Sequence, residues 1–167
     1  MSDNTTNQDA VVIERTFAAP QALIWDMWTQ AEHFQSWYGP RSMSIPVANM
    51  DVRVGGKRLI CMKSPDGSMK MWFTGEYREV SPTARLVYTE SMADEDGNLL
   101  SPADMGMPPG HPETTEVTVV LETIGEGTKM TMTHAGVPAE SPGAGGWMQA
   151  LDKLAEHVAA VGNDRSA

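Results

Sequence analysis

Residues 141–162 read SPGAGGWMQALDKLAEHVAAVG, and this stretch decides the fold. One apolar stripe recurs along it at steps of four and three residues: Trp147, Leu151, Leu154, Val158 and Val161. Ser141 and Pro142 suit the start of a helix, and Gly162 suits its end. The glycines before Trp147 predict that the regular helix begins only near Gly146. No other helical pattern in the sequence is long enough to cover this stripe, so its partner must be a sheet.

The composition is typical of one globular domain. The chain has 167 residues, of which 41% are apolar and 20% charged. A net charge of -10 without any basic stripe argues against nucleic acid or a membrane surface as a partner. Cys61 is the single cysteine, which excludes an intrachain disulfide and predicts an intracellular, cytoplasmic setting. The chain has no run of eighteen apolar residues that could span a bilayer, and residues 1–9 lack the pattern of a signal peptide.

The element order predicts an α+β domain. Seven segments show the period or composition of strands: Val11–Phe17, Met43–Val54, Lys57–Lys63, Met69–Val80, Arg85–Met92, Thr114–Ile124 and Thr128–Ala135. Two short helices, Pro20–Thr29 and Ala31–Trp37, follow the first strand. Short turns join most neighbouring strands, so most of the sheet should be an antiparallel meander that curves around the C-terminal helix. Any space left between sheet and helix becomes a pocket.

The expected domain covers residues 10–162, with a disordered tail at 1–9 and a second tail at 163–167. A long insertion, Asp94–Glu113, separates two strands, and loops of that length are usually functional or mobile.

Alternation along the strands predicts which side chains face the helix. The inward set is Leu86, Tyr88, Glu90, Met92, Val117, Val119, Leu121, Met130, Met132 and His134. The register of two strands stays open. In Lys57–Lys63, either Ile60 and Met62 or Leu59 and Cys61 face the helix. In Met69–Val80, the adjacent Trp72 and Phe73 must point to opposite faces, and a bulge could shift the register. The candidate ligand-binding residues are Trp37, Ile60, Met62, Trp72, Tyr88, Glu90, Val119, Leu121, Met132, His134, Trp147 and Leu151.

The thirteen methionines and five tryptophans allow two interpretations. Methionine is flexible and suits a cavity that fits more than one shape, but it also fills gaps in an ordinary core. Tryptophan can likewise line a cavity or pack inside a core.

His134 and Glu90 are the candidate catalytic residues. Each is predicted to lie among apolar neighbours, where burial shifts a pKa and makes acid–base chemistry available. In the alternative interpretation, His134 satisfies a backbone carbonyl while Glu90 lies at a wet mouth or pairs with an arginine. The sequence has no metal-ligand spacing, phosphate loop or dinucleotide motif, so no metal or cofactor is expected. Cys61 is expected to be a small buried hydrophobe rather than a nucleophile.

Short motifs in chain order carry a resemblance to a known family. They are ERTFAAP at 14–20, Trp25, WT at 28–29, WYGP at 37–40, DVRVGG at 51–56, PDG at 65–67, GEYREV at 75–80, RLVYT at 85–89, GW at 146–147 and LD at 151–152. Together they resemble the START-like (SRPBCC) superfamily, and within it the bacterial single-domain proteins named after the activator of heat-shock protein 90 ATPase. The resemblance covers roughly Val12 to Val161 and implies the helix-grip (START/Bet v-like) fold.

The wider superfamily that the chain resembles holds lipids, hormones, polyketides and other apolar molecules between sheet and helix, and some of its members are cyclases. We therefore expect binding of a small, largely apolar molecule in this cavity. An enzyme of the cyclase, dehydratase or hydrolase kind that uses His134 or Glu90 is one alternative. The other is an interaction module that activates the chaperone ATPase through its outer surface. The sequence is also compatible with a homodimer.

Overall fold

The computed structural model describes residues 10–101, 114–137 and 142–166. These residues form one seven-stranded sheet and three helices. The strands are β1 (Ala10–Phe17), β2 (Ser44–Met50), β3 (Lys57–Lys63), β4 (Lys70–Ser81), β5 (Arg85–Ala93), β6 (Thr114–Ile124) and β7 (Gly127–Ala135). The helices are α2 (Gln21–Thr29), α3 (Ala31–Trp37) and α4 (Pro142–Ser166). The predicted tail at 1–9, Ser141 and most of the Asp94–Glu113 insertion lie outside the described residues.

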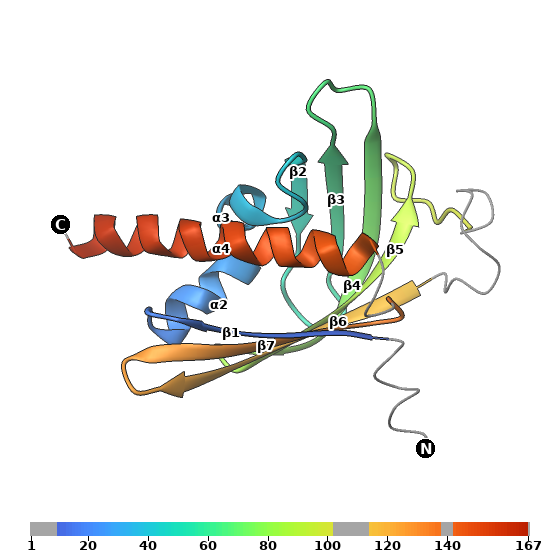
Figure 1. Cartoon of the computed structure of the whole chain (residues 1–167). Coiled ribbons are helices and arrows are strands. Elements are labelled where there is room, and N and C mark those ends of the chain that lie inside the picture. Colours follow the sequence, from blue (N-terminus) through green and yellow to red (C-terminus); the bar gives the residue numbers. More distant parts are fainter. Residues whose placement is uncertain (1–9, 102–113, 138–141, 167) are drawn as a thin grey trace, which may run out of the picture.

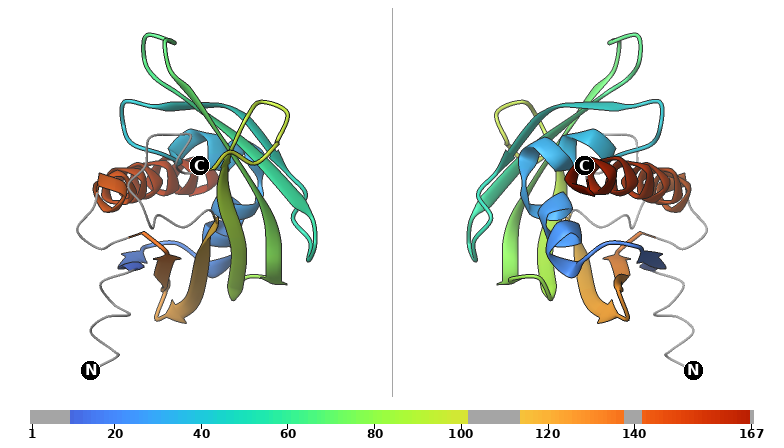
Figure 2. Two further views of the ribbon diagram at one scale, coloured as in Figure 1. Left: turned by 90° about the vertical axis from the view of Figure 1, so that its right-hand side faces the viewer. Right: turned by 90° about the vertical axis from the view of Figure 1, so that its left-hand side faces the viewer.

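All strand pairs in the sheet are antiparallel, in the order β1-β7-β6-β5-β4-β3-β2. The strands from β2 to β7 follow one another as the predicted meander, and β1 joins the free edge of β7. Figure 1 shows α4 lying across the sheet, and the end-on views in Figure 2 show the sheet curving around it. This arrangement confirms the predicted helix-grip α+β fold.

The curvature of the sheet has visible local causes. The register shifts between Ser44 and Val47 in β2 and between Tyr77 and Glu79 in β4, and such irregularities bend a strand. Gly75 lies in β4 at a close approach to β5, where a Cβ atom would fall 1.9 Å from the carbonyl oxygen of Thr89. Only glycine fits there without moving the backbone.

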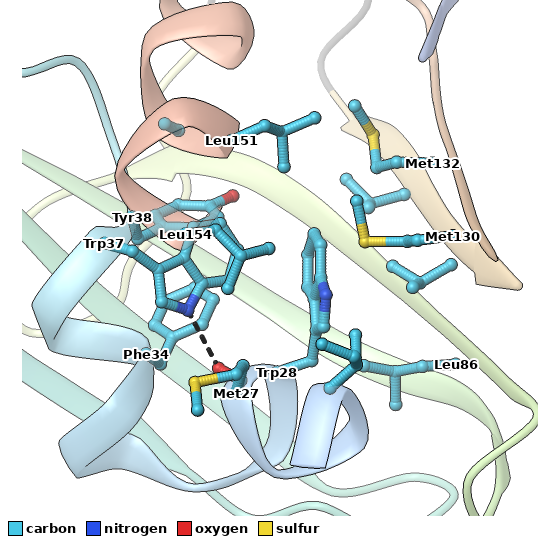
Figure 3. Packing of buried hydrophobic residues seen from close by; sticks show 14 of the residues in the cluster. Met27, Trp28, Phe34, Trp37, Tyr38, Leu86, Met130, Met132, Leu151 and Leu154 are labelled. Atoms are coloured by element: carbon cyan, nitrogen blue, oxygen red, sulfur yellow. Dashed lines mark hydrogen bonds between the residues drawn. The ribbon is translucent and has the colours of Figure 1, made fainter. Parts of the chain in front are cut away.

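The core lies between α4, the short helices and the inner face of the sheet. In Figure 3, Trp28 of α2 stands between the aromatic group of α3 and the sheet residues Leu86 and Met130. Trp28 meets Trp37 edge-to-face, with ring centroids 4.7 Å apart, and the indole of Trp37 donates a hydrogen bond to the Met27 carbonyl at 3.0 Å. From α4, the predicted stripe residues Trp147, Leu151, Leu154 and Val158 are buried.

The boundaries of α4 and β2 differ from the prediction. The helix begins at Pro142 and ends at Ser166, so it includes the glycine-rich segment and passes Gly162. Glycine costs a helix about 1 kcal/mol relative to alanine, and tertiary packing routinely overrides such a propensity. Strand β2 stops at Met50 rather than Val54, because the chain turns from Asp51 onward: the Arg53 N–H donates to the Asp51 carbonyl at 2.9 Å, and the Gly56 N–H donates to the Arg53 carbonyl at 2.8 Å.

The predicted inner faces of β5, β6 and β7 are confirmed. Leu86, Val117, Val119, Met130 and Met132 are almost completely buried. On β3, Ile60 and Met62 face the core cluster. Ile60 pairs with Phe73 on β4, which places Phe73 on the inner face and its neighbour Trp72 on the outer face. In the described parts of the chain, no helix combines the length and the hydropathy needed to cross a membrane.

Candidate functional site

A cavity of about 190 Å³ lies between the first turns of α4, the segment after α3 and the sheet. Its walls are mainly apolar and include Pro40, Met62, Phe73, Val137, Trp147 and Ala150, together with Gly39 and Gly146. Three polar side chains also face it: Tyr38, Glu90 and His134. An engineered apolar cavity of about 150 Å³ holds benzene, whereas drug-sized ligands use about 300 Å³ or more. The cavity therefore fits a molecule of about one ring.

The segment after α3, residues 38–41, forms one wall of the cavity and is bonded to side chains of α4. Lys153 donates hydrogen bonds to the carbonyl oxygens of Tyr38 and Pro40, at 3.3 and 3.2 Å. Arg41 pairs with Glu156, and its backbone N–H donates to Gln149. Between Tyr38 and Pro40, position 39 requires glycine. Gly39 has a φ of 80°, and a Cβ atom there would lie 2.9 Å from Cε of Met62.

Both ring nitrogens of His134 are engaged. The indole N–H of Trp147 donates to Nδ1 at 2.8 Å, and Nε2 lies 2.7 Å from Oγ1 of Thr115. Indole can only donate, so Nδ1 must be the acceptor and the ring proton of the neutral histidine sits on Nε2. The Thr115 hydroxyl in turn donates to the Glu90 carbonyl at 3.1 Å. This series of hydrogen bonds holds His134 as a neutral ring and connects it to the backbone of β5.

Glu90 ends a second chain of hydrogen bonds. The hydroxyl of Tyr38 donates to Oε2 of Glu90 at 2.9 Å and lies 3.2 Å from the hydroxyl of Tyr88. Because Tyr38 uses its single proton on Glu90, Tyr88 must donate to Tyr38. Burial, together with the charge of Glu90, raises the pKa of Tyr38 well above its ordinary value, and burial also raises the pKa of Tyr88. Both hydroxyls therefore keep their protons at neutral pH.

Arg58 lies beneath this cluster and is buried, with 2% of its surface exposed. Its guanidinium carbon lies 3.7 Å from the ring centroid of Tyr88, 5.3 Å from that of Phe34 and 5.8 Å from that of Tyr77, which are cation–π distances. Its Nη1 lies 3.6 Å from Oε2 of Glu90. None of its three guanidinium nitrogens donates a hydrogen bond to a described residue. The aromatic rings and the charge of Glu90 thus replace the water that this cation has lost.

Acidification should destabilise the fold through two histidines. Burial lowers the pKa of His134, and burial together with the neighbouring His33 lowers the pKa of His157. Below the unfolded pKa of about 6.5, the unfolded chain binds more protons than the folded one, so the free energy of unfolding falls as pH drops. We expect this loss between pH 7 and 5, with a slope of at most about 1.4 kcal/mol per pH unit for each histidine. Urea unfolding across this range measures it.

His134→Gln and His157→Gln serve as variants for this test, because glutamine does not titrate and still carries a hydrogen-bond donor and acceptor. Each substitution should flatten part of the pH profile. A wild-type profile that is already flat from pH 7 to 5 would contradict the expectation.

The structure places the candidate ligand-binding residues in three groups. Met62, Glu90, His134 and Trp147 line the cavity. Seven others belong to the packed core instead: Trp37, Ile60, Tyr88, Val119, Leu121, Met132 and Leu151. Trp72 lies on the outer face of the sheet, because its neighbour Phe73 pairs with the inward-facing Ile60.

Sequence reasoning missed several residues of the cavity and its surroundings. They are Tyr38, Gly39, Pro40, Phe73, Val137, Gly146 and Ala150 on the lining and Arg58 beneath it. Arg58 could have been found, because it alternates with Ile60 and Met62 on β3. Among the described residues, no group of three or more histidine, cysteine, aspartate or glutamate side chains could hold a metal ion.

Fold and cavity together define a helix-grip domain, in which a curved antiparallel sheet holds a long C-terminal helix beside a partly open pocket. The profile of the family described as Activator of Hsp90 ATPase homolog 1-like protein matches residues 18–159, and the chain belongs to this family. The resemblance seen in the sequence motifs is thereby confirmed. No match was found among curated proteins.

Solved structures of bacterial proteins share this fold. A protein from Chromobacterium violaceum is 24% identical with a TM-score of 0.74, and the match covers 90% of this chain and 96% of that one. A protein from Nitrosomonas europaea is 22% identical with a TM-score of 0.74, covering 92% and 96%. The AHSA1 protein from Silicibacter pomeroyi is 19% identical with a TM-score of 0.71, covering 90% and 98%. At these identities the likeness concerns the fold alone.

Proposed function

We propose that the chain binds a small, largely apolar molecule of about one ring in the cavity between the sheet and α4. The observation that carries this proposal is the cavity itself, which has a volume of about 190 Å³ and mostly apolar walls. A mostly apolar hollow between the sheet and a helix, with a few polar side chains on its wall, is the usual form of a small-molecule site. Family membership supports the proposal weakly, because a fold hosts many functions.

The enzyme alternative meets an obstacle at His134. Its two ring nitrogens already bond Trp147 and Thr115, so a catalytic base at this position would first have to lose one of these partners. Glu90 keeps one carboxylate oxygen available, since the Tyr38 hydroxyl bonds only Oε2, and an available acceptor on the cavity wall suits recognition of a ligand.

Ligand binding can be tested with toluene as the probe. We expect toluene to bind the wild-type protein and to shift the NMR signal of the Trp147 indole N–H, because this indole lies on the cavity wall. The substitution Ala150→Leu should abolish the shift, because Ala150 is buried on the lining and leucine would occupy the space of the probe. Titration of ¹⁵N-labelled protein measures both results.

Ala159→Leu provides the matched control, because Ala159 is exposed on the same helix. It should bind toluene as the wild type does. If toluene leaves the Trp147 signal of the wild type unchanged, or shifts it equally in Ala150→Leu, the proposal is wrong. The chaperone alternative needs no cavity, and stimulation of the chaperone ATPase that persists in Ala150→Leu would support it.

A further inference from the structure

We propose that the cavity selects neutral ligands that carry a hydrogen-bond donor, an O–H or N–H group, and that Oε1 of Glu90 accepts this bond. This inference rests on the proposed function and defines the chemical class of its ligand. It follows from the hydrogen-bonding state of each polar side chain that faces the cavity.

The side-chain donors on the cavity lining are all in use. Tyr38 gives its proton to Glu90, His134 gives its proton to Thr115, and Trp147 gives its proton to His134. A ligand acceptor such as a carbonyl oxygen would therefore have to break one of these bonds. A hydrogen-bond acceptor on the ligand would therefore add little to its affinity for the cavity.

One side-chain acceptor on the lining remains available. Oε2 of Glu90 accepts the Tyr38 hydroxyl, but in the described part of the chain no hydrogen-bond donor contacts Oε1. Glu90 lines the cavity, and 13% of its side chain is exposed. A carboxylate oxygen in these surroundings is a strong acceptor, and hydrogen bonds to charged groups exceed those between neutral groups.

Arg58 explains why a carboxylate is found in this apolar site and why the ligand need not be charged. The guanidinium stays protonated, and its Nη1 lies 3.6 Å from Oε2 of Glu90, so the buried pair is neutral as a whole. Arg58 does not line the cavity; it is a positioning residue, whose buried positive charge lies against the carboxylate of Glu90. An anionic ligand would be repelled by Glu90, which lines the cavity. A cationic ligand would lose its own hydration on entering a site whose buried ion pair is already neutral.

The remaining walls restrict the rest of the ligand. Met62, Phe73 and Trp147 offer apolar and aromatic surface, and the volume admits about one ring. A ring with one hydroxyl or ring N–H group, as in phenol, combines both requirements.

Phenol and toluene test the inference, because they have nearly the same shape and differ by a hydroxyl in place of a methyl group. An apolar cavity without an acceptor would prefer toluene, since burying an unpaired hydroxyl is unfavourable. We expect phenol to bind about tenfold more tightly than toluene, in titrations followed by the Trp147 indole N–H signal. In Glu90→Gln, the ratio of the phenol affinity to the toluene affinity should fall about tenfold, while the affinity for toluene stays the same.

Glu122→Gln is the matched control, because it removes the same charge from an exposed carboxylate on β6. It should leave both affinities unchanged. If Glu90→Gln does not fold, the double variant Arg58→Met with Glu90→Gln removes both buried charges and should show the same loss of phenol preference.

The outcomes separate the two proposals. Toluene binding as tightly as phenol, benzoate binding more tightly than phenol, or a phenol preference that survives in the Glu90 variants would overturn the donor inference and leave apolar binding intact. If toluene does not bind the wild-type protein, the proposed function itself is wrong, whether or not phenol binds.

Discussion

Replacement of Arg58 by alanine is expected to lower the free energy of unfolding by about 3 to 5 kcal/mol, the usual effect of removing one partner from a buried ion pair. The substitution leaves the Glu90 carboxylate without its countercharge. It also empties the space between the rings of Phe34, Tyr77 and Tyr88 that the guanidinium fills. Urea unfolding of the two proteins at pH 7 measures the difference.

The double variant Arg58→Met with Glu90→Gln is the informative control. Methionine keeps an apolar stem among the rings, and glutamine keeps an acceptor for the Tyr38 hydroxyl. Because both charges are gone, the double variant should be within about 1 kcal/mol of the wild type or more stable. A loss of less than about 1 kcal/mol in Arg58→Ala would show that the pair has little importance for the fold.

Replacement of Trp147 by alanine is expected to cost about 3 to 5 kcal/mol as well, and to change what the cavity holds. Trp147 is buried, stacks on Trp28 with ring centroids 6.1 Å apart, and meets Tyr38 edge-to-face at 5.5 Å. Its loss would enlarge the cavity and leave Nδ1 of His134 without a donor. We expect the variant to bind naphthalene, a two-ring probe that the wild type should reject.

Trp147→Phe separates the two effects of the alanine substitution. It keeps a six-membered ring in place but removes the five-membered ring, whose N–H bonds His134. The expected cost is therefore about 1 to 3 kcal/mol, and the cavity should still exclude naphthalene. Calorimetric titration with both probes gives the comparison. If Trp147→Ala rejects naphthalene while remaining folded, the side chain does not limit the size of the ligand.

The elements of the fold were predictable because their signals are local. The steps of four and three residues in α4 and the alternation in β6 and β7 each indicate a buried face within a single segment. The choice between Trp72 and Phe73 was not local, because it depends on which of them pairs with Ile60 of β3. The helix start at Pro142 also depends on tertiary packing, which overrides the low propensity of the glycines.

The cavity was only partly predictable, for a different reason. Alternation shows which side chains face inward, but the volume left between them depends on how large side chains from separate elements fill the interior. Trp28 and Trp37 fill it toward the short helices, so inward residues such as Val119 and Met132 belong to a packed core. Arg58 was missed because a charged residue is expected at the surface, although its position on β3 indicated the inner face.

The pairing of β1 with β7 sets the order in which the fold can form. Residues near the beginning of the described chain lie beside residues near its end, with Val11 opposite His134 and Phe17 opposite Thr128. A ribosome releases β1 first, yet its pairing strand is synthesised only after the rest of the meander. Such distant contacts slow folding, because a long loop must be closed before the contacts compensate for it. The β7 strand that carries His134 is therefore also the element whose synthesis allows the first strand to join the sheet.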